Sequence, residues 1–184
     1  LDSTDNDGPP GDPVVVGGDD STGEQHTDSS GSSSELDRSR VERLVHQYVN
    51  QERTSRGLDE LEYNGELVLV ARDHGRDMYE RGYFAHVSPS GETVGDRYDE
   101  AGIRCSTSGE NIAQTWAFAN VRTDSGVAVY ETEEALARAI VDQWMNSSGH
   151  RENILRESFS EQGIGIVLVD VDGRVKVYAV QNFC

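Results

Sequence analysis

Apolar residues at regular spacing begin only at Leu36 in this chain of 184 residues. Residues 1–35 are rich in Gly, Asp, Ser, Thr and Pro, and their one short apolar run is Val14, Val15 and Val16. A segment of this composition cannot bury enough apolar surface to offset the entropy lost on ordering. The sequence therefore predicts a disordered acidic stalk or linker over residues 1–35 and one folded domain over residues 36–184.

Two amphipathic helices are predicted at the start of this domain, ended by Gly57 and Gly82. The apolar stripe of the first consists of Val41, Leu44, Val45, Tyr48 and Val49. The stripe of the second consists of Leu67, Val70, Ala71, His74 and Met78. A lone histidine inside an apolar stripe favours a buried, hydrogen-bonded side chain over a ligand.

Helix and strand patterns alternate through the rest of the chain. Residues 93–101 are predicted to form a short helix and residues 109–114 a strand. Thr132 is suited to cap a further helix, because its side-chain oxygen accepts from the free amides of a first turn. Leu136 and Trp144 belong to the apolar stripe of that helix.

The chain ends in two strand-like runs, residues 163–169 and 175–183. Asp172 and Gly173 between them are typical of a tight hairpin turn. Helices on either side of a small, largely antiparallel sheet are therefore predicted, which is an α+β fold.

The formal net charge of −18 opposes binding to phosphate backbones, so nucleic acid is not expected as a partner. Lys176 is the only lysine, and arginine supplies every other basic group. At about 1 M salt, screening over about 3 Å suppresses repulsion between carboxylates. The composition favours a halophilic protein, with an acidic protein from an ordinary habitat as the alternative.

Cys105 and Cys184 are the two cysteines of the chain, far apart and without the close spacing of a zinc motif. They are compatible with a disulfide, two buried thiols or part of a metal site. A disulfide is favoured because both lie beside predicted strands, and it would imply an oxidising compartment. No apolar run of 18 or more residues occurs, so no transmembrane segment is predicted in this stretch of chain.

Three segments carry a recognisable signature: FAHVSPSG at 84–91, GENIAQ at 109–114 and WMNSSGHRENIL at 144–155. In their order and spacing they resemble the CAP superfamily of cysteine-rich secretory proteins, antigen 5 and pathogenesis-related 1 proteins, and its bacterial and archaeal SCP-like secreted branch most closely. The resemblance implies a three-layer α-β-α sandwich with a cleft lined by two histidines and two glutamates.

Matched motif by motif, the resemblance places His86, Glu110 and His150 in this cleft. Ser147 stands where members with the full set carry the second glutamate, which argues against an activity that needs two carboxylates. Asn111 and Asn153 are expected to tie loop backbone groups through their amides, and Arg151 to pair with an acid such as Glu110.

Two imidazoles and one carboxylate are a suitable ligand set for zinc or another divalent cation, which makes His86, Glu110 and His150 the candidate metal ligands. Their spacing gives no separate support for a metal, because they come from different segments. Hydrogen bonds that join the loops, or direct acid–base catalysis, are the alternatives.

The resemblance implies an extracellular or cell-surface protein that acts as a binding module, with a lipid, small-molecule, ion or protein ligand that the sequence does not name. A metal-dependent hydrolase or peptidase is one alternative, with water activated at the histidines. A structural protein of the cell envelope, presented on its stalk, is the other.

Overall fold

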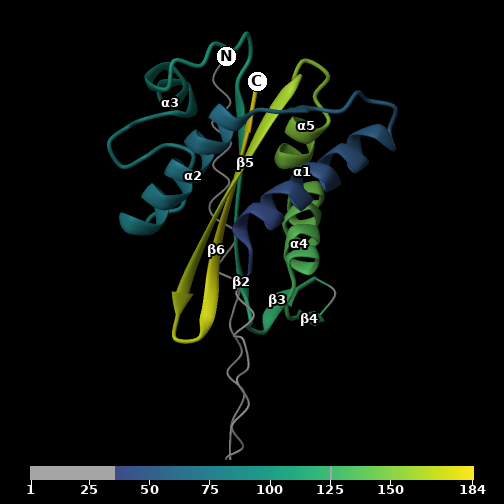
Figure 1. Ribbon diagram of the computed structural model, residues 1–184, viewed down its shortest axis with the longest axis vertical. Helices are drawn as coiled ribbons and strands as arrows, with labels where there is room; N and C mark the ends of the chain where they lie inside the picture. The colour runs from purple at the N-terminus through teal and green to yellow at the C-terminus, as the bar shows by residue number, and fades with distance from the viewer. Residues whose placement is uncertain (1–35, 125) are drawn as a thin grey trace, which may run out of the picture.

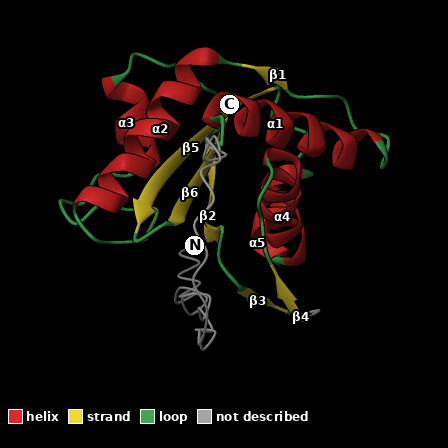
Figure 2. Ribbon diagram, turned by 60° about the horizontal axis from the view of Figure 1, so that its bottom comes forward, coloured by secondary structure: helices red, strands yellow, loops and turns green. Residues whose placement is uncertain are grey.

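The computed structural model describes residues 36–124 and 126–184. The predicted stalk, with its run from Val14 to Val16, lies outside the described residues. Within them, the chain forms three layers, with helices on both faces of one sheet (Figure 1, Figure 2). The predicted three-layer α+β fold is confirmed.

The main sheet of the described residues has four strands in the order β1-β5-β6-β2. Their bounds are Glu62–Tyr63 for β1, Gly109–Ala117 for β2, Glu161–Val171 for β5 and Arg174–Phe183 for β6. β1 pairs with β5 in parallel, and the other two pairings are antiparallel, so the sheet is largely antiparallel as predicted.

A separate hairpin, β3 (Val121–Thr123) with β4 (Gly126–Ala128), was not predicted. Strands of three residues are too short to show the alternation from which strands are recognised.

The helices of the described residues are α1 (Arg38–Thr54), α2 (Gly65–Glu80), α3 (Val94–Glu100), α4 (Glu133–Asn146) and α5 (Ser148–Ile154). Side chains that accept from first-turn amides cap the first four at Asp37, Asn64, Thr93 and Thr132. The predicted cap at Thr132 is thus confirmed. Over the described ranges, no helix combines the length and apolar character needed to cross a bilayer.

The hairpin between β5 and β6 turns through Asp172 and Gly173, as the sequence predicts. Both residues have positive φ, 54° and 76°. Positive φ at both central positions gives a two-residue turn whose twist matches that of the flanking strands. The register of β6 on β5 therefore begins at the pair Val171 and Arg174.

Two glycines of β5 let α2 lie directly on the sheet. A Cβ added at Gly163 would lie 2.4 Å from the carbonyl carbon of Leu67, and one at Gly165 would lie 2.4 Å from Arg72 N. Backbone atoms cannot move aside as a flexible side chain does, so any larger residue would push the helix away.

Glu42 of α1 joins both helical layers to β5. Its buried carboxylate accepts from Arg72 Nε of α2 at 2.8 Å and from the backbone amide of Ile166 at 3.1 Å. A buried carboxylate needs such partners, because its desolvation is otherwise uncompensated. The pair Glu42–Arg72 is therefore structural, and it gives a buried ion pair outside the candidate site.

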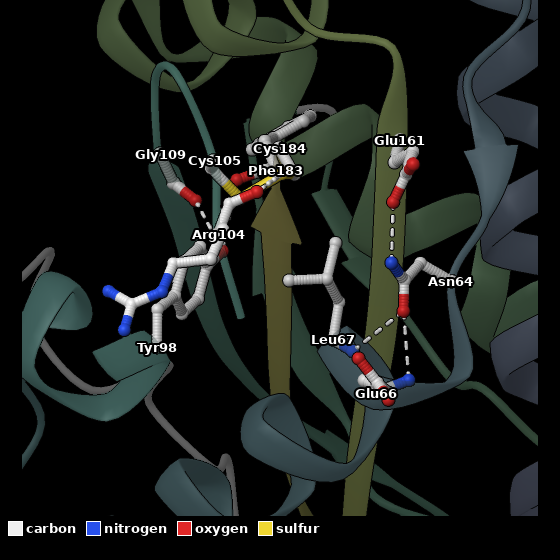
Figure 3. The surroundings of a disulfide bond; sticks show 10 residues. All are labelled: Asn64, Glu66, Leu67, Tyr98, Arg104, Cys105, Gly109, Glu161, Phe183 and Cys184. Atoms are coloured by element: carbon white, nitrogen blue, oxygen red, sulfur yellow. Dashed lines mark hydrogen bonds between the residues drawn. A yellow bond between two sulfur atoms is a disulfide. The ribbon is translucent and has the colours of Figure 1, made fainter. Parts of the chain in front are cut away.

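Cys105 and Cys184 form a disulfide, with their Cα atoms 5.2 Å apart. The bond fastens the loop before β2 to the residue after β6 (Figure 3). Beside it, the Tyr98 hydroxyl donates to the Phe183 carbonyl at 3.0 Å. Of the three arrangements that the sequence allows, the favoured one is confirmed.

The acidic excess extends into the folded domain, where residues 41–184 carry 24 acidic and 14 basic side chains. Because like charges repel most at low ionic strength, we expect the melting temperature to rise by roughly 10 °C between about 0.1 M and 3 M potassium chloride. The triple variant E60Q/E80Q/E157Q, which neutralises three exposed carboxylates, should melt higher in low salt and respond less to added salt. A melting temperature that does not change with salt would rule out the halophile prediction.

Candidate functional site

Glu110 is the centre of the candidate site. Successive side chains of a strand point to opposite faces, and that of Glu110 lies on the face of the sheet covered by α2 and α3. Its side chain is 2% exposed. Oε2 accepts from Arg97 Nη2 at 2.7 Å, and Oε1 lies 2.9 Å from His86 Nδ1. Both carboxylate oxygens are therefore engaged within the chain.

Two further side chains border this carboxylate. His74 Nε2 of α2 lies 3.7 Å from Glu110 Oε1. The Asn182 amide, in the orientation that satisfies both of its ends, donates to Glu110 Oε2 and accepts from the Ala71 amide, each at 3.2 Å. Glu110 is thus held from α2, α3, β6 and the loop that carries His86.

Arg97 is the cation of this group, and its side chain is 7% exposed. It belongs to α3, whose start is fixed by reciprocal hydrogen bonds between Thr93 and Asp96. Its Nη2 also donates to the His86 carbonyl at 3.2 Å, and its Nη1 donates to the Glu92 carbonyl at 3.4 Å. Arg97 therefore positions both the main chain at His86 and the carboxylate that holds the His86 ring.

His86 is the member of this group that faces solvent, with a side chain 50% exposed. An ionised carboxylate only accepts hydrogen bonds, so the contact to Glu110 requires a proton on His86 Nδ1. This fixes the tautomer of the neutral ring and leaves Nε2 as the nitrogen available to a ligand.

His74 is buried, at 1% exposure, as the sequence analysis favoured. Its Nε2 lies 3.1 Å from the Ala85 carbonyl, which fixes the proton on that nitrogen because a carbonyl only accepts. Burial is the largest cause of a lowered pKa at His74, and the nearby Glu110 charge opposes it in part. His74 is therefore harder to protonate than an exposed histidine.

A lowered pKa at His74 makes stability depend on pH. In the unfolded chain His74 takes up a proton at about pH 6.5, and in the folded chain it does so only at a lower pH. The contribution of His74 to the free energy of unfolding is therefore complete above about pH 6.5 and is lost as the pH falls below it. We expect the protein to unfold at a lower urea concentration at about pH 5.5 than at about pH 7.5. H74Q, whose amide keeps a donor for Ala85, should reduce this difference. The pKa of His46 is also lowered by burial, so a smaller slope should remain; equal slopes in both proteins would contradict the assignment.

The main chain at His150 contacts β2 on the face of the sheet opposite to the Glu110 side chain. It lies on α5, and its carbonyl accepts from Asn111 Nδ2 at 3.1 Å. Asn153 Nδ2 donates to Asn111 Oδ1 at 2.9 Å and to the Glu110 carbonyl at 3.4 Å. The Asn111 and Asn153 amides thus each bond a main-chain carbonyl of a neighbouring segment.

The three predicted metal ligands are not assembled into one cluster. Over residues 36–124 and 126–184, no three His, Cys, Asp or Glu side chains are placed to hold a metal ion. The structure brings His86 and Glu110 together, whereas His150 starts from the other face of the sheet. In addition, the Arg97 guanidinium already contacts Glu110 Oε2, and the His86 ring contacts Oε1, so a cation bound to either oxygen would have to displace one of them. The arrangement therefore does not fit a divalent ion held by Glu110.

Arg151 and Ser147 are the remaining predicted site residues of the motif. Arg151 does not pair with Glu110; its Nη1 donates to the Met145 carbonyl at 3.3 Å, because α5 and the Glu110 carboxylate lie on different faces of the sheet. Ser147 joins α4 to α5 and makes no side-chain capping hydrogen bond. Its expected place at the rim of a cleft stays a prediction.

A cavity of about 420 Å³ opens beside the site, on the side of α2 and α3. Its lining residues are Val70, Asp73, His74, Asp77, Glu92, Arg97, Glu100 and Ala101. Its size falls within the range of small-ligand pockets. Since His74 and Arg97 both line the cavity and border Glu110, a ligand bound there would lie close to the same buried charges.

The family profile of the cysteine-rich secretory protein family, CAP, matches residues 46–183. The chain belongs to this family. Two relatives in Bacillus subtilis are similar to it: the uncharacterized protein YkwD, 35% identical over 129 residues, and the uncharacterized membrane protein YlbC, 30% identical over 142 residues. These alignments cover 70% and 77% of this chain but 43% and 34% of the relatives. The chain thus spans less than half the length of either relative.

Solved structures place the CAP domain in the same fold. An extracellular protein with an SCP domain from Bacillus anthracis is 28% identical, with a TM-score of 0.60 over 79% of this chain and 40% of that one. An outer surface protein from Borrelia burgdorferi is 17% identical, with a TM-score of 0.60 over 80% and 95% of the two chains. At that identity the second likeness shows the fold alone.

Proposed function

We propose that this chain is an extracellular binding module of the CAP family, whose ligand contacts His86. The observation that supports it is the contrast within the His86–Glu110 pair. Glu110 is buried, and both of its oxygens are occupied, whereas half of the His86 side chain faces solvent. A fixed, exposed imidazole above a buried ion pair is suited to recognising a ligand, and the cavity at Arg97 and His74 offers room beside it.

An extracellular place is supported by two findings. The disulfide between Cys105 and Cys184 is of a kind that persists in oxidising compartments. The Bacillus anthracis protein with a similar fold is described as extracellular. The net charge of −18 argues against nucleic acid, and a lipid, a small molecule, an ion or a protein stays the proposed ligand class.

The test follows the His86 ring nitrogens by NMR while three probes are added: a long-chain fatty acid, phosphatidylglycerol vesicles and an N-acetylglucosamine oligomer. We expect at least one probe to shift the Nε2 signal and to bind at least about tenfold more weakly to H86Q. H46Q, which alters a histidine of α1 outside the site, should bind as the wild type does. A probe that shifts the His86 signals of the wild type but binds H86Q with unchanged affinity would contradict a ligand site at His86, and three probes that leave His86 undisturbed would exclude these lipids and this sugar as its ligand.

Hydrolysis is a second candidate, supported by the same contact. A carboxylate that holds Nδ1 of a histidine is also the arrangement that orients a general base. Were His86 such a base, a peptide or ester substrate would be cleaved by the wild type and not by H86Q. Under the binding proposal, the two proteins should show the same background rate.

A further inference from the structure

We infer that the guanidinium of Arg97 occupies the cation position of this site, so that the His86–Glu110 pair takes its ligand without a divalent metal. The inference rests on the proposed function only in placing a ligand at His86. The charges that it assigns follow from the burial of Glu110 and from the contacts of Glu110 with Arg97 and His86.

Arg97 balances the charge of Glu110. A carboxylate that is 2% exposed needs a compensating positive charge, since a buried unpaired charge is strongly unfavourable. Arg97 Nη2 at 2.7 Å from Oε2 supplies that charge. An arginine keeps its proton under all ordinary conditions, so this compensation does not depend on pH or on metal supply.

Further hydrogen bonds hold the Arg97 guanidinium in place. Its guanidinium also donates to the carbonyls of His86 and Glu92, at 3.2 Å and 3.4 Å. Rotating it away would break both of these hydrogen bonds and remove the guanidinium from Glu110, although the Glu92 carbonyl would still accept from the Ser88 amide. A planar group with several fixed donors is held more firmly than a single-point ammonium would be.

A divalent metal ion would bind poorly at Glu110. A divalent cation at Glu110 would lie beside a fixed positive charge and compete with it for the same oxygens. The oxygen that remains, Oε1, already receives the proton of His86 Nδ1. His86 Nε2 is then the one free ligand atom of the pair, and a single imidazole binds zinc weakly.

This arrangement also indicates the kind of group that the ligand presents. With the proton on Nδ1, the neutral His86 ring offers Nε2 as a hydrogen-bond acceptor. The group that it recognises is therefore a donor, such as a hydroxyl or an amine, and no metal needs to bridge them.

The test removes the cation and measures zinc binding at His86. Zinc chloride is titrated into the full chain while the ring signals of His86 are recorded by NMR, with the wild type, R97Q and R97K compared. R97Q removes the charge but keeps amide donors, and R97K keeps the charge. We expect R97Q to bind zinc at His86 at least about tenfold more tightly than the wild type or R97K. R72Q, which neutralises the partner of Glu42 away from the site, should behave as the wild type does.

A reciprocal variant keeps the inference testable even if R97Q does not fold. E110Q leaves the guanidinium in place without its nearest anion, and the Glu92 carboxylate that remains lies farther away, 3.9 Å from Nη1. Inorganic phosphate should therefore bind beside His86 at least about tenfold more tightly than in the wild type. Zinc binding by the wild type as tight as that of R97Q, or no gain in phosphate binding by E110Q, would overturn the inference. If the organic probes bind H86Q as tightly as the wild type while these ion titrations succeed, the proposed ligand site at His86 fails and the charge assignment stands.

Discussion

Reduction of the Cys105–Cys184 disulfide is expected to lower the free energy of unfolding by about 4 kcal/mol. The bond links residues 79 apart in sequence, and closing a loop of that length restricts the unfolded chain by about this amount in the chain-entropy model. The measurement is urea unfolding of the oxidised and the reduced protein, with C105S/C184S as a variant that cannot reoxidise.

This disulfide should matter for the site as well as for stability. Cys105 precedes Glu110 by one short loop, and the amides of Ser160 and Glu161 donate to the Cys184 carbonyl at 2.8 Å and 3.0 Å. These hydrogen bonds remain after reduction, so we expect a less stable domain that is still folded. Unfolding midpoints that agree for the oxidised protein and C105S/C184S would show that the bond contributes no stability.

Replacing Arg97 by methionine should destabilise the domain by about 3–5 kcal/mol, because Glu110 would become a buried carboxylate without a cation. R97M keeps a long apolar side chain, so the loss reflects charge more than packing. R97M/E110Q removes both charges and should recover most of the stability.

Removing the negative charge of Glu110 should destabilise the domain less than removing the positive charge of Arg97. In E110Q, Arg97 keeps the carbonyls of His86 and Glu92, and the Glu92 carboxylate lies 3.9 Å from its Nη1. We therefore expect E110Q to be destabilised less than R97M in the same urea experiment. Equal stability of R97M and R97M/E110Q would show that Glu110 does not depend on Arg97 for its charge balance.

Local features of the chain were predicted well from the sequence. The cap at Thr132, the turn at Asp172 and Gly173 and the buried His74 each depend on neighbouring residues or on one periodic stripe. Such features are set by backbone preference and side-chain spacing, which a single sequence contains.

The partner of Glu110 was not predicted correctly, for a reason that lies in the sheet. Arg151 belongs to one of the motif segments and was the expected partner, but it lies on α5, across the sheet from the Glu110 side chain. Arg97 comes from α3, and nothing in its local spacing distinguishes it from other surface arginines. Alternation along β2, combined with knowledge of which helices cover which face, would have indicated α3 as the source of the cation.

The motifs predicted that His86 and Glu110 lie together, but they did not predict that the two side chains have different roles. The sequence left open whether His86, Glu110 and His150 join loops by hydrogen bonds, hold a metal or act in acid–base catalysis, and it did not distinguish the buried, paired carboxylate from the exposed imidazole. Burial is a property of the packed layers, so spacing along the chain does not reveal it.

Glu110 holds the His86 ring with Nε2 toward solvent, and NMR of the histidine ring nitrogens in the wild type and E110Q can establish this. We expect that, in the neutral ring of wild-type His86, Nδ1 carries the proton and Nε2 is unprotonated, and that E110Q loses this preference. A neutral His86 ring with its proton mainly on Nε2, or one with the same tautomer in E110Q, would contradict it.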